Sequence, residues 1–257
     1  MAALLQFLRP DWPKVPGVQA LSTTRAGGSS AAPFTSLNLG AHVGDAAAAV
    51  KANREQLRIA ASLPTEPAWL TQVHGTSVAD LDVIAGGDDI VADAAVAAQP
   101  GRVCIVMTAD CLPVLLAAAD GSAVAAIHAG WRGLASGVIE AAVQGLRVKA
   151  TSGVAVLAWL GPAIGLAHFE VGEEVRAAFL QKDPAAAQSF TPNNSGRWQC
   201  DLYGLARQRL RSLGITAISG GNHCTYADAR RFYSHRRDVQ HEGRVGTGRM
   251  ASFIWRT

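Results

Sequence analysis

The sequence predicts a fold of the α+β or α/β class, with a mixed β-sheet and flanking helices in a single domain. Short apolar runs of strand length recur along the chain, and longer segments with helical periodicity lie between them. No linker, repeat or charge block marks a domain boundary, so we expect one domain over residues 1–257. The chain is 49% hydrophobic and 17% charged, which excludes an intrinsically disordered protein.

The first half is expected to begin with a loop, because turn residues cluster at 13–16 and 25–30 within residues 1–40. Asp45 is a candidate cap for a helix that runs to about Ala61. Period and composition predict strands over 68–73, 75–81, 103–108, 112–117 and 123–127.

The second half alternates between helices and strands. Helices are expected over 133–148, 171–180 and 201–213, the last capped by Asp201 and ended by Gly214. Strands are expected over 154–160, 215–218 and 251–255.

The charge pattern argues against a polyanion or a membrane as partner. The net charge is +3, from 23 Lys+Arg and 20 Asp+Glu without a basic stripe, so we expect no nucleic-acid binding. The most apolar region, 103–129, is interrupted by polar residues and proline, so we expect no membrane span. The first residues lack a basic region typical of signal peptides, which predicts a cytoplasmic protein with reduced thiols.

Three potential metal ligands lie at the ends of apolar, strand-like segments: His74, Cys111 and His128. Two imidazoles and a thiolate form a three-ligand set of the catalytic zinc type, which leaves a fourth position open. These donors suit Zn²⁺ or copper better than Mg²⁺ or Ca²⁺. The spacing follows no known ligand motif. Taken singly, each histidine is better interpreted as structural and Cys111 as a small buried residue.

Two glycine-containing loops are candidate anion sites. Gly130-Trp-Arg132-Gly133 precedes a predicted helix, whose free N–H groups would point at an anion. Arg25-Ala-Gly-Gly-Ser-Ser30 could wrap its backbone N–H groups around a second one. Each alone is as easily a turn beside a surface arginine. Together they indicate room for phosphate or carboxylate beside the metal.

The remaining polar residues carry weaker signals. Asp110 either orients a ligand or caps a turn. Cys104 lies within an apolar run and is assigned to the core, and Cys200 and Cys224 lack a CxxC partner. The other histidines without paired spacing are expected on the surface or in loops, and these are His168, His223, His235 and His241.

A series of short motifs spans nearly the whole chain, and together they are highly specific. In order they are Ser22-Thr-Thr-Arg-Ala-Gly-Gly-Ser29, Ser36-Leu-Asn-Leu-Gly40, His42-Val-Gly-Asp45, Gln72-Val-His74-Gly75, Thr108-Ala-Asp-Cys-Leu-Pro-Val114, His128-Ala-Gly-Trp-Arg-Gly133, Gly161-Pro-Ala-Ile-Gly165, Phe169-Glu-Val-Gly172, Cys224-Thr-Tyr226 and Thr247-Gly-Arg-Met-Ala251. With them the sequence closely resembles the YfiH family, also called the multicopper polyphenol oxidase or laccase-domain family.

The resemblance implies an α+β sandwich and a metal site at His74, Cys111 and His128, with Zn²⁺ as the expected ion and Cu²⁺ as the alternative. It also implies phosphorolysis of adenosine, inosine and S-methyl-5′-thioadenosine, with adenosine deamination alongside. The expected partners are therefore a purine nucleoside and phosphate. The sequence does not determine the oligomeric state, and a monomer is compatible with it.

As a mechanistic hypothesis, phosphate is held by Arg25, Asn38 and Arg132 together with backbone N–H groups. His74 and Cys111 are the expected catalytic residues, and Asp110 is the adjacent carboxylate available as general acid or base. Phe232-Tyr-Ser-His235 departs from the family pattern, which has tyrosine in place of His235. Residues 239–245 look like a small insertion.

Two other functions compete with this one. Cys111 could be the nucleophile and His128 the base of a hydrolase or amidase that edits peptidoglycan precursors. This excludes a zinc-bound Cys111, because one thiolate cannot serve both purposes. The other candidate is a zinc- or copper-binding redox protein resembling polyphenol oxidases, although three ligands are too few for a multicopper cluster.

Overall fold

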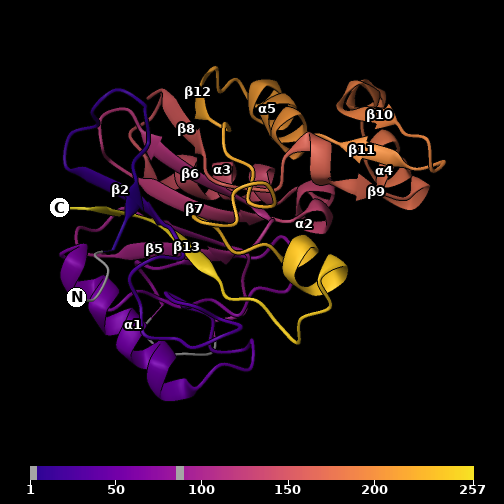
Figure 1. Cartoon of the computed structure of the whole chain (residues 1–257). Helices are drawn as coiled ribbons and strands as arrows, with labels where there is room; N and C mark the ends of the chain where they lie inside the picture. Colours follow the sequence, from indigo (N-terminus) through magenta and orange to yellow (C-terminus); the bar gives the residue numbers. More distant parts are fainter. Residues whose placement is uncertain (1–4, 85–89) are drawn as a thin grey trace.

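The core of the molecule is a six-stranded mixed sheet with the order β12-β8-β6-β7-β4-β3. The computed structural model describes residues 5–84 and 90–257 (Figure 1). The β12–β8 and β3–β4 pairs are parallel, and the other pairs are antiparallel. The strands are β3 (Val78–Asp80), β4 (Ala94–Ala97), β6 (Leu112–Ala118), β7 (Val124–Ala129), β8 (Val156–Leu160) and β12 (Ala217–Gly220).

A second, antiparallel sheet packs against one face of the first. Its order is β1-β2-β13-β5, with β1 (Phe7–Leu8), β2 (Val18–Thr23), β13 (Met250–Arg256) and β5 (Val103–Thr108). Buried side chains of β5 and β13 meet those of β6 and β7 in one cluster that includes Val106, Ile254, Leu115 and Ala126. The predicted α+β sandwich is therefore confirmed.

Helices cover the outer faces of both sheets. α3 (Val138–Lys149) places Val138, Ala142 and Leu146 at helical spacing against the six-stranded sheet, beside α5 (Leu202–Ser212). α1 (Ala47–Ala60) covers the four-stranded sheet, where its Leu57 is fully buried. The resulting order of layers is helices, sheet, sheet, helix (Figure 1).

A small three-stranded sheet lies at one end of the molecule. It has the order β10-β11-β9 and packs with α4 (Glu173–Leu180). Its strands are β9 (Glu170–Val171), β10 (Phe190–Pro192) and β11 (Trp198–Cys200). A π-helix, Arg236–His241, follows in the chain before β13. None of the helices in the described ranges is long and apolar enough to cross a membrane.

Several predicted elements differ from the structure. Residues 1–40 are not only loop, because they contain β1 and β2, and β2 buries Ser22 and Thr23 against β13. The Ser22 hydroxyl accepts a hydrogen bond from Ser252, and the Thr23 hydroxyl accepts one from the Ala251 amide. Such polar residues are typical of loops, and here the distant strand β13 provides the hydrogen bonds that allow them to be buried in a sheet. Asp45 does not cap α1, since the N-cap is Ala46 and the Asp45 side chain accepts from Asn38.

Two further expectations were wrong. Residues 68–73 form only an isolated bridge at Thr71, and the Gln72 side chain pairs with both backbone groups of Met107 in place of a strand. The helix expected over 133–148 is two helices, α2 (Trp131–Ser136) and α3, because Gly137 takes a left-handed conformation with φ 108°. β4 and the sheet β9–β11 were not predicted.

Candidate active site

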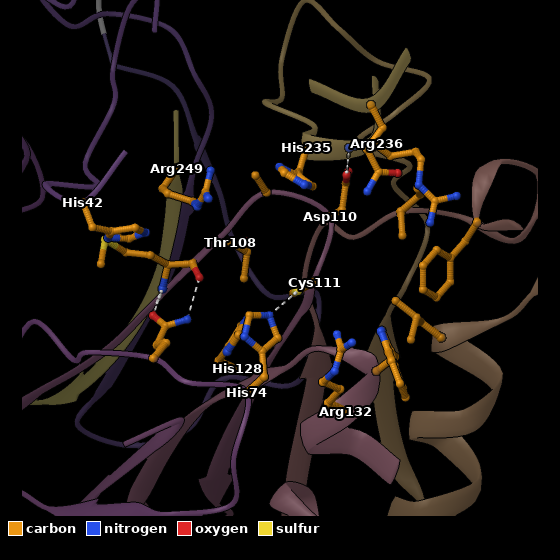
Figure 2. Close-up of a pocket in the computed structure, with 18 residues that line it drawn as sticks. His42, His74, Thr108, Asp110, Cys111, His128, Arg132, His235, Arg236 and Arg249 are labelled. Carbon is orange, nitrogen blue, oxygen red and sulfur yellow. Dashed lines mark hydrogen bonds between the residues drawn. The ribbon is translucent and has the colours of Figure 1, made fainter. Parts of the chain in front are cut away.

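The three predicted metal ligands lie together where β6 begins and its partner β7 ends (Figure 2). His74 comes from the loop before β3, Cys111 immediately precedes β6, and His128 is in β7. His74 Nε2 is 3.7 Å from Cys111 Sγ, and the candidate ligand atoms of all three residues lie within 4.8 Å of one another. They form a group that can hold a metal ion.

A buried carboxylate that the sequence analysis missed positions both histidines. Asp93 Oδ1 accepts a hydrogen bond from His128 Nδ1 at 2.8 Å, which leaves His128 Nε2 as the ring nitrogen for a metal. The same carboxylate accepts from the backbone N–H groups of His74 at 2.9 Å and Gly75 at 2.7 Å. His74 has φ 60°, a conformation uncommon outside glycine, and these bonds hold it there.

The electrostatics of the group favour a thiolate. Burial raises the pKa of Cys111, but the neighbouring His128 and His74 outweigh it and lower that pKa to about 6. Burial lowers the pKa of His128, but Cys111 and Asp93 outweigh it and raise that pKa to about 9. An anionic sulfur with two imidazoles is a donor set for Zn²⁺ or copper.

Gly130 gives these ligands the space they occupy. A Cβ at this position would lie 2.7 Å from His74 Cδ2 and 3.0 Å from Cys111 Sγ. Any side chain at residue 130 would therefore displace the ligands. Gly130, the first glycine of the His128-Ala-Gly-Trp-Arg-Gly133 motif, therefore allows the backbone to pack closely against the ligands.

The group lies in a pocket of about 390 Å³. Apolar side chains line part of it, namely Met107, Ala109, Trp131, Ile164, Phe169 and Leu202. Polar side chains line the rest, and besides the three ligands these are His42, Gln72, Thr108, Asp110, Arg132, His235, Arg236, Gln240 and Arg249. A pocket of this size and mixture suits a small organic substrate with an anionic group.

The predicted phosphate residues are not brought together. Arg132 lines the pocket, where its exposed guanidinium lies 4.3 Å from the Trp131 ring centroid. Arg25 does not line it, and its guanidinium donates to the carbonyls of Thr35 and Ala229. Asn38 is fully buried behind the pocket, and its Oδ1 accepts from the backbone N–H of Arg249 at 2.9 Å.

Asp110 lines the pocket next to Cys111, but its carboxylate is occupied. Oδ1 accepts from the Thr225 hydroxyl at 2.6 Å, and Oδ2 accepts from the Ser234 hydroxyl at 3.0 Å and the Arg236 N–H at 2.7 Å. Its φ is 89°, which these bonds maintain. The carboxylate thus ties the loop of Cys111 to the C-terminal third of the chain.

Comparison with known proteins agrees with the sequence motifs. The family model described as multi-copper polyphenol oxidoreductase laccase matches residues 19–257. A protein of Escherichia coli named purine nucleoside phosphorylase YfiH is 49% identical over 253 residues, 97% of this chain and 98% of the relative. This chain belongs to the YfiH family.

Solved structures of similar proteins share the fold. Protein NMB0706 of Neisseria meningitidis superposes with a TM-score of 0.88 at 45% identity, covering 97% of this chain and 98% of the other. YlmD of Geobacillus stearothermophilus gives a TM-score of 0.87 at 29% identity, covering 97% and 96%. A curated relative from Pseudomonas aeruginosa, 50% identical over 97% of this chain and 98% of its own, is also named purine nucleoside phosphorylase.

Several site residues of this YfiH-family chain were not assigned from sequence. Asp93 could have been suspected as the one acid within the apolar run 90–97. Arg249 lies in the motif Thr247-Gly-Arg-Met-Ala251 but was given no role, and His235 was expected to be an ordinary surface or loop residue. His235 is indeed exposed, but it faces the pocket. Cys104 and Cys200 are buried in the core.

Proposed function

We propose that this protein is a zinc-dependent purine nucleoside phosphorylase that acts on adenosine, inosine and S-methyl-5′-thioadenosine, with adenosine deaminase activity alongside. The observation that carries the proposal is the convergence of His74, Cys111 and His128 in a pocket large enough for a small substrate. Relatives with 46–50% identity over nearly the whole chain carry the phosphorylase name. A cytoplasmic location, where thiols stay reduced, would suit the ligand Cys111.

The metal would be held by His74, Cys111 and His128, with Asp93 fixing the orientation of the histidines. A bound Zn²⁺ would supply Lewis-acid chemistry at the pocket, and copper is the alternative ion for the same donors. The donor set supports this assignment because the pKa of Cys111 is lowered to about 6, so that its sulfur is a thiolate, the form that binds a metal, at neutral pH.

The apolar side chains would bind the purine. Trp131 and Phe169 offer aromatic surfaces, and Ile164 and Leu202 add aliphatic ones. Their enclosure of the base would exclude water from the glycosidic bond. Arg132, exposed at the pocket lining, would contribute positive charge to bind substrate.

The proposed role of Asp110 is positioning. Three hydrogen-bond donors already occupy its two oxygens, which favours a carboxylate that fixes the Cys111 loop over one that exchanges protons with substrate. Arg25 and Asn38, which lie outside the pocket lining, are likewise proposed to support the loops around it.

The test is phosphate-dependent turnover. The purified protein, with its metal content measured, is incubated with inosine or adenosine with and without phosphate, and the products are separated by chromatography. We expect release of hypoxanthine or adenine only with phosphate, inosine from adenosine by deamination, and loss of metal and turnover in Cys111→Ala. Full zinc occupancy without nucleoside turnover would overturn the proposal.

A second candidate, a cysteine hydrolase acting on peptidoglycan precursors, has one observation in its favour. The Cys111 pKa of about 6 is that of an activated nucleophile, and His128, whose pKa is raised to about 9, would be the base that takes the thiol proton. Activity in metal-free protein that is abolished by thiol alkylation would establish it. The redox alternative has less support, because the described residues contain a single group of three metal-binding side chains.

A further inference from the structure

Arg249 is a firmly held cation of the pocket. Its Nη1 donates to the carbonyls of Thr247 at 2.9 Å and Gly248 at 3.2 Å, and its backbone N–H donates to Asn38. The aliphatic part of its side chain packs so closely on Gly40 that a Cβ there would lie 2.8 Å from Arg249 Cγ. The guanidinium is therefore fixed at the pocket before any ligand arrives.

No carboxylate neutralises this guanidinium. The ion pairs within 4.0 Å among the described residues all involve other basic side chains. The negative groups that act on Arg249 from further away are Cys111 and Asp110, and Asp110 is occupied by its own three donors. Burial lowers the pKa of Arg249, yet a guanidinium stays charged at neutral pH. A half-buried cation that bonds only to neutral carbonyls keeps an unbalanced charge, which a bound anion would neutralise.

Two imidazoles flank the guanidinium. In Figure 2, Arg249 lies between His42 and His235, on one side of the three metal ligands, and Arg132 lies on the other side. Partial desolvation at the pocket lining, and after it the positive charge of Arg249, lowers the pKa of each imidazole. Both rings are therefore mainly neutral at pH 7, and a neutral imidazole keeps one N–H donor. One fixed cation with two neutral donors matches a tetrahedral oxyanion.

We infer that Arg249, flanked by His42 and His235, binds the attacking phosphate on the side of the metal ligands away from Arg132. This inference rests on the proposed phosphorolysis. The purine then occupies the opposite side, where Trp131 lies under Arg132 and Phe169 lies near Arg236. Asn38, expected from sequence to touch the substrate, acts instead as a positioning residue for Arg249.

The reaction is balanced with phosphate in this place. A phosphate oxygen forms a bond to C1′ of the ribose while the bond from C1′ to the purine nitrogen breaks. The electron pair of that bond leaves with the purine, which takes up the proton that hydrogen phosphate loses. Ribose 1-phosphate and the free base are the products, and no oxidant or reductant is needed.

The experiment compares Arg249→Gln and Arg249→Lys with Arg211→Gln, an exposed arginine of α5 outside the pocket lining. Steady-state rates with varied phosphate and varied inosine give both KM values. We expect Arg249→Gln to raise the phosphate KM at least tenfold, about 1.4 kcal/mol, with a smaller change in the inosine KM. Arg249→Lys, which keeps the charge and loses the planar fork, should lie between, and Arg211→Gln should match the parent protein.

A binding measurement separates this inference from the proposed function. Thermal unfolding is followed with inorganic phosphate and, separately, with acetate at the same ionic strength. Phosphate should raise Tm of the parent protein and of Arg211→Gln, but not of Arg249→Gln, even if no nucleoside is turned over. Nucleoside turnover with an unchanged phosphate KM in both folded Arg249 variants would overturn the inference alone. Protection by acetate and not by phosphate would overturn it too, because Arg249 would then recognise a carboxylate.

Discussion

The carboxylate of Asp93 links the two histidines of the candidate metal centre. Its Oδ1 lies 2.8 Å from His128 Nδ1 and 2.9 Å from the backbone nitrogen of His74. Burial raises the pKa of Asp93, but its bonds to His128 and to the N–H groups of Gly75 and His74 outweigh this and lower the pKa. Asp93 therefore stays ionised at neutral pH and orients ligands from two separate segments of the chain.

Asp93→Asn should weaken metal binding about 10–100-fold, because the amide is a poorer acceptor for His128 Nδ1–H and for the His74 loop. Chelator competition followed by metal analysis measures this. Asp120→Asn is the control, since Asp120 is exposed, lies outside the pocket lining and bonds to Ser122 and Thr151. If the asparagine variant kept the parent affinity, Asp93 would have only a structural role.

Cys111 in metal-free protein should be alkylated by iodoacetamide with a rate that rises through about pH 6. Its pKa is lowered to about 6, so the thiolate predominates above that pH, whereas an ordinary thiol reacts this way near pH 8.5. Mass spectrometry at a series of pH values locates the modified residue. Bound zinc should protect Cys111 at every pH tested.

The same experiment has internal controls. Burial raises the pKa of Cys104 and Cys200, so both should remain unmodified in the folded protein. A Cys111 profile centred near pH 8.5 would mean that the imidazoles do not stabilise its thiolate.

Gly130→Ala should reduce metal content at least tenfold while the protein stays folded. The new Cβ would meet His74 and Cys111 at 3.0 Å or less, so the ligands must move apart. Gly145→Ala is a matched control, because its Cβ on α3 would lie 3.4 Å from the nearest atom, a Val96 methyl. Metal analysis and circular dichroism of both variants provide the comparison. Equal metal content would show that the site can adapt.

Asp110→Asn should lower the free energy of unfolding by about 1–3 kcal/mol. The NH2 group of asparagine would replace one accepting oxygen and would then face a hydrogen-bond donor. Asparagine tolerates the left-handed backbone at this position, so the effect is confined to the lost hydrogen bonds. Urea denaturation measures the change, and Thr225→Val, which removes one donor, should cost less. A loss of kcat with unchanged stability would instead make Asp110 the general acid or base expected from sequence.

The buried apolar strands were predictable, because β5 to β8 are continuous apolar runs that lie inside a sheet. β2 was missed because Ser22 and Thr23 look like loop residues until β13, more than 200 residues later, provides their hydrogen bonds. The break at Gly137 was missed because helical periodicity continues across it. Local patterns contain no information about such distant or conformational effects.

The site follows the same division. His74, Cys111 and His128 were predicted as metal ligands from their residue types, their places at the ends of apolar segments and the resemblance to the family. In the sequence, Arg25 and Arg132 are both arginines near glycines. Only Arg132 lines the pocket, because the guanidinium of Arg25 donates to the carbonyl of Thr35. Asp93 is the one acid of the apolar run 90–97 and Arg249 lies in the motif Thr247-Gly-Arg-Met-Ala251, but neither pattern identifies the partners of these side chains. Their roles come from contacts that the tertiary fold alone creates.

The position of β13 determines when the pocket can form during synthesis. This strand pairs with β2 on one side and β5 on the other, and Arg249 immediately precedes it. A nascent chain that has released β2 and β5 but not β13 has a gap in its four-stranded sheet and lacks the cationic wall of the pocket. The residues of the candidate metal group, all within 74–128, are synthesised well before Arg249. The side chains of this one pocket therefore leave the ribosome in two stages, the metal-ligand candidates first and the arginine last.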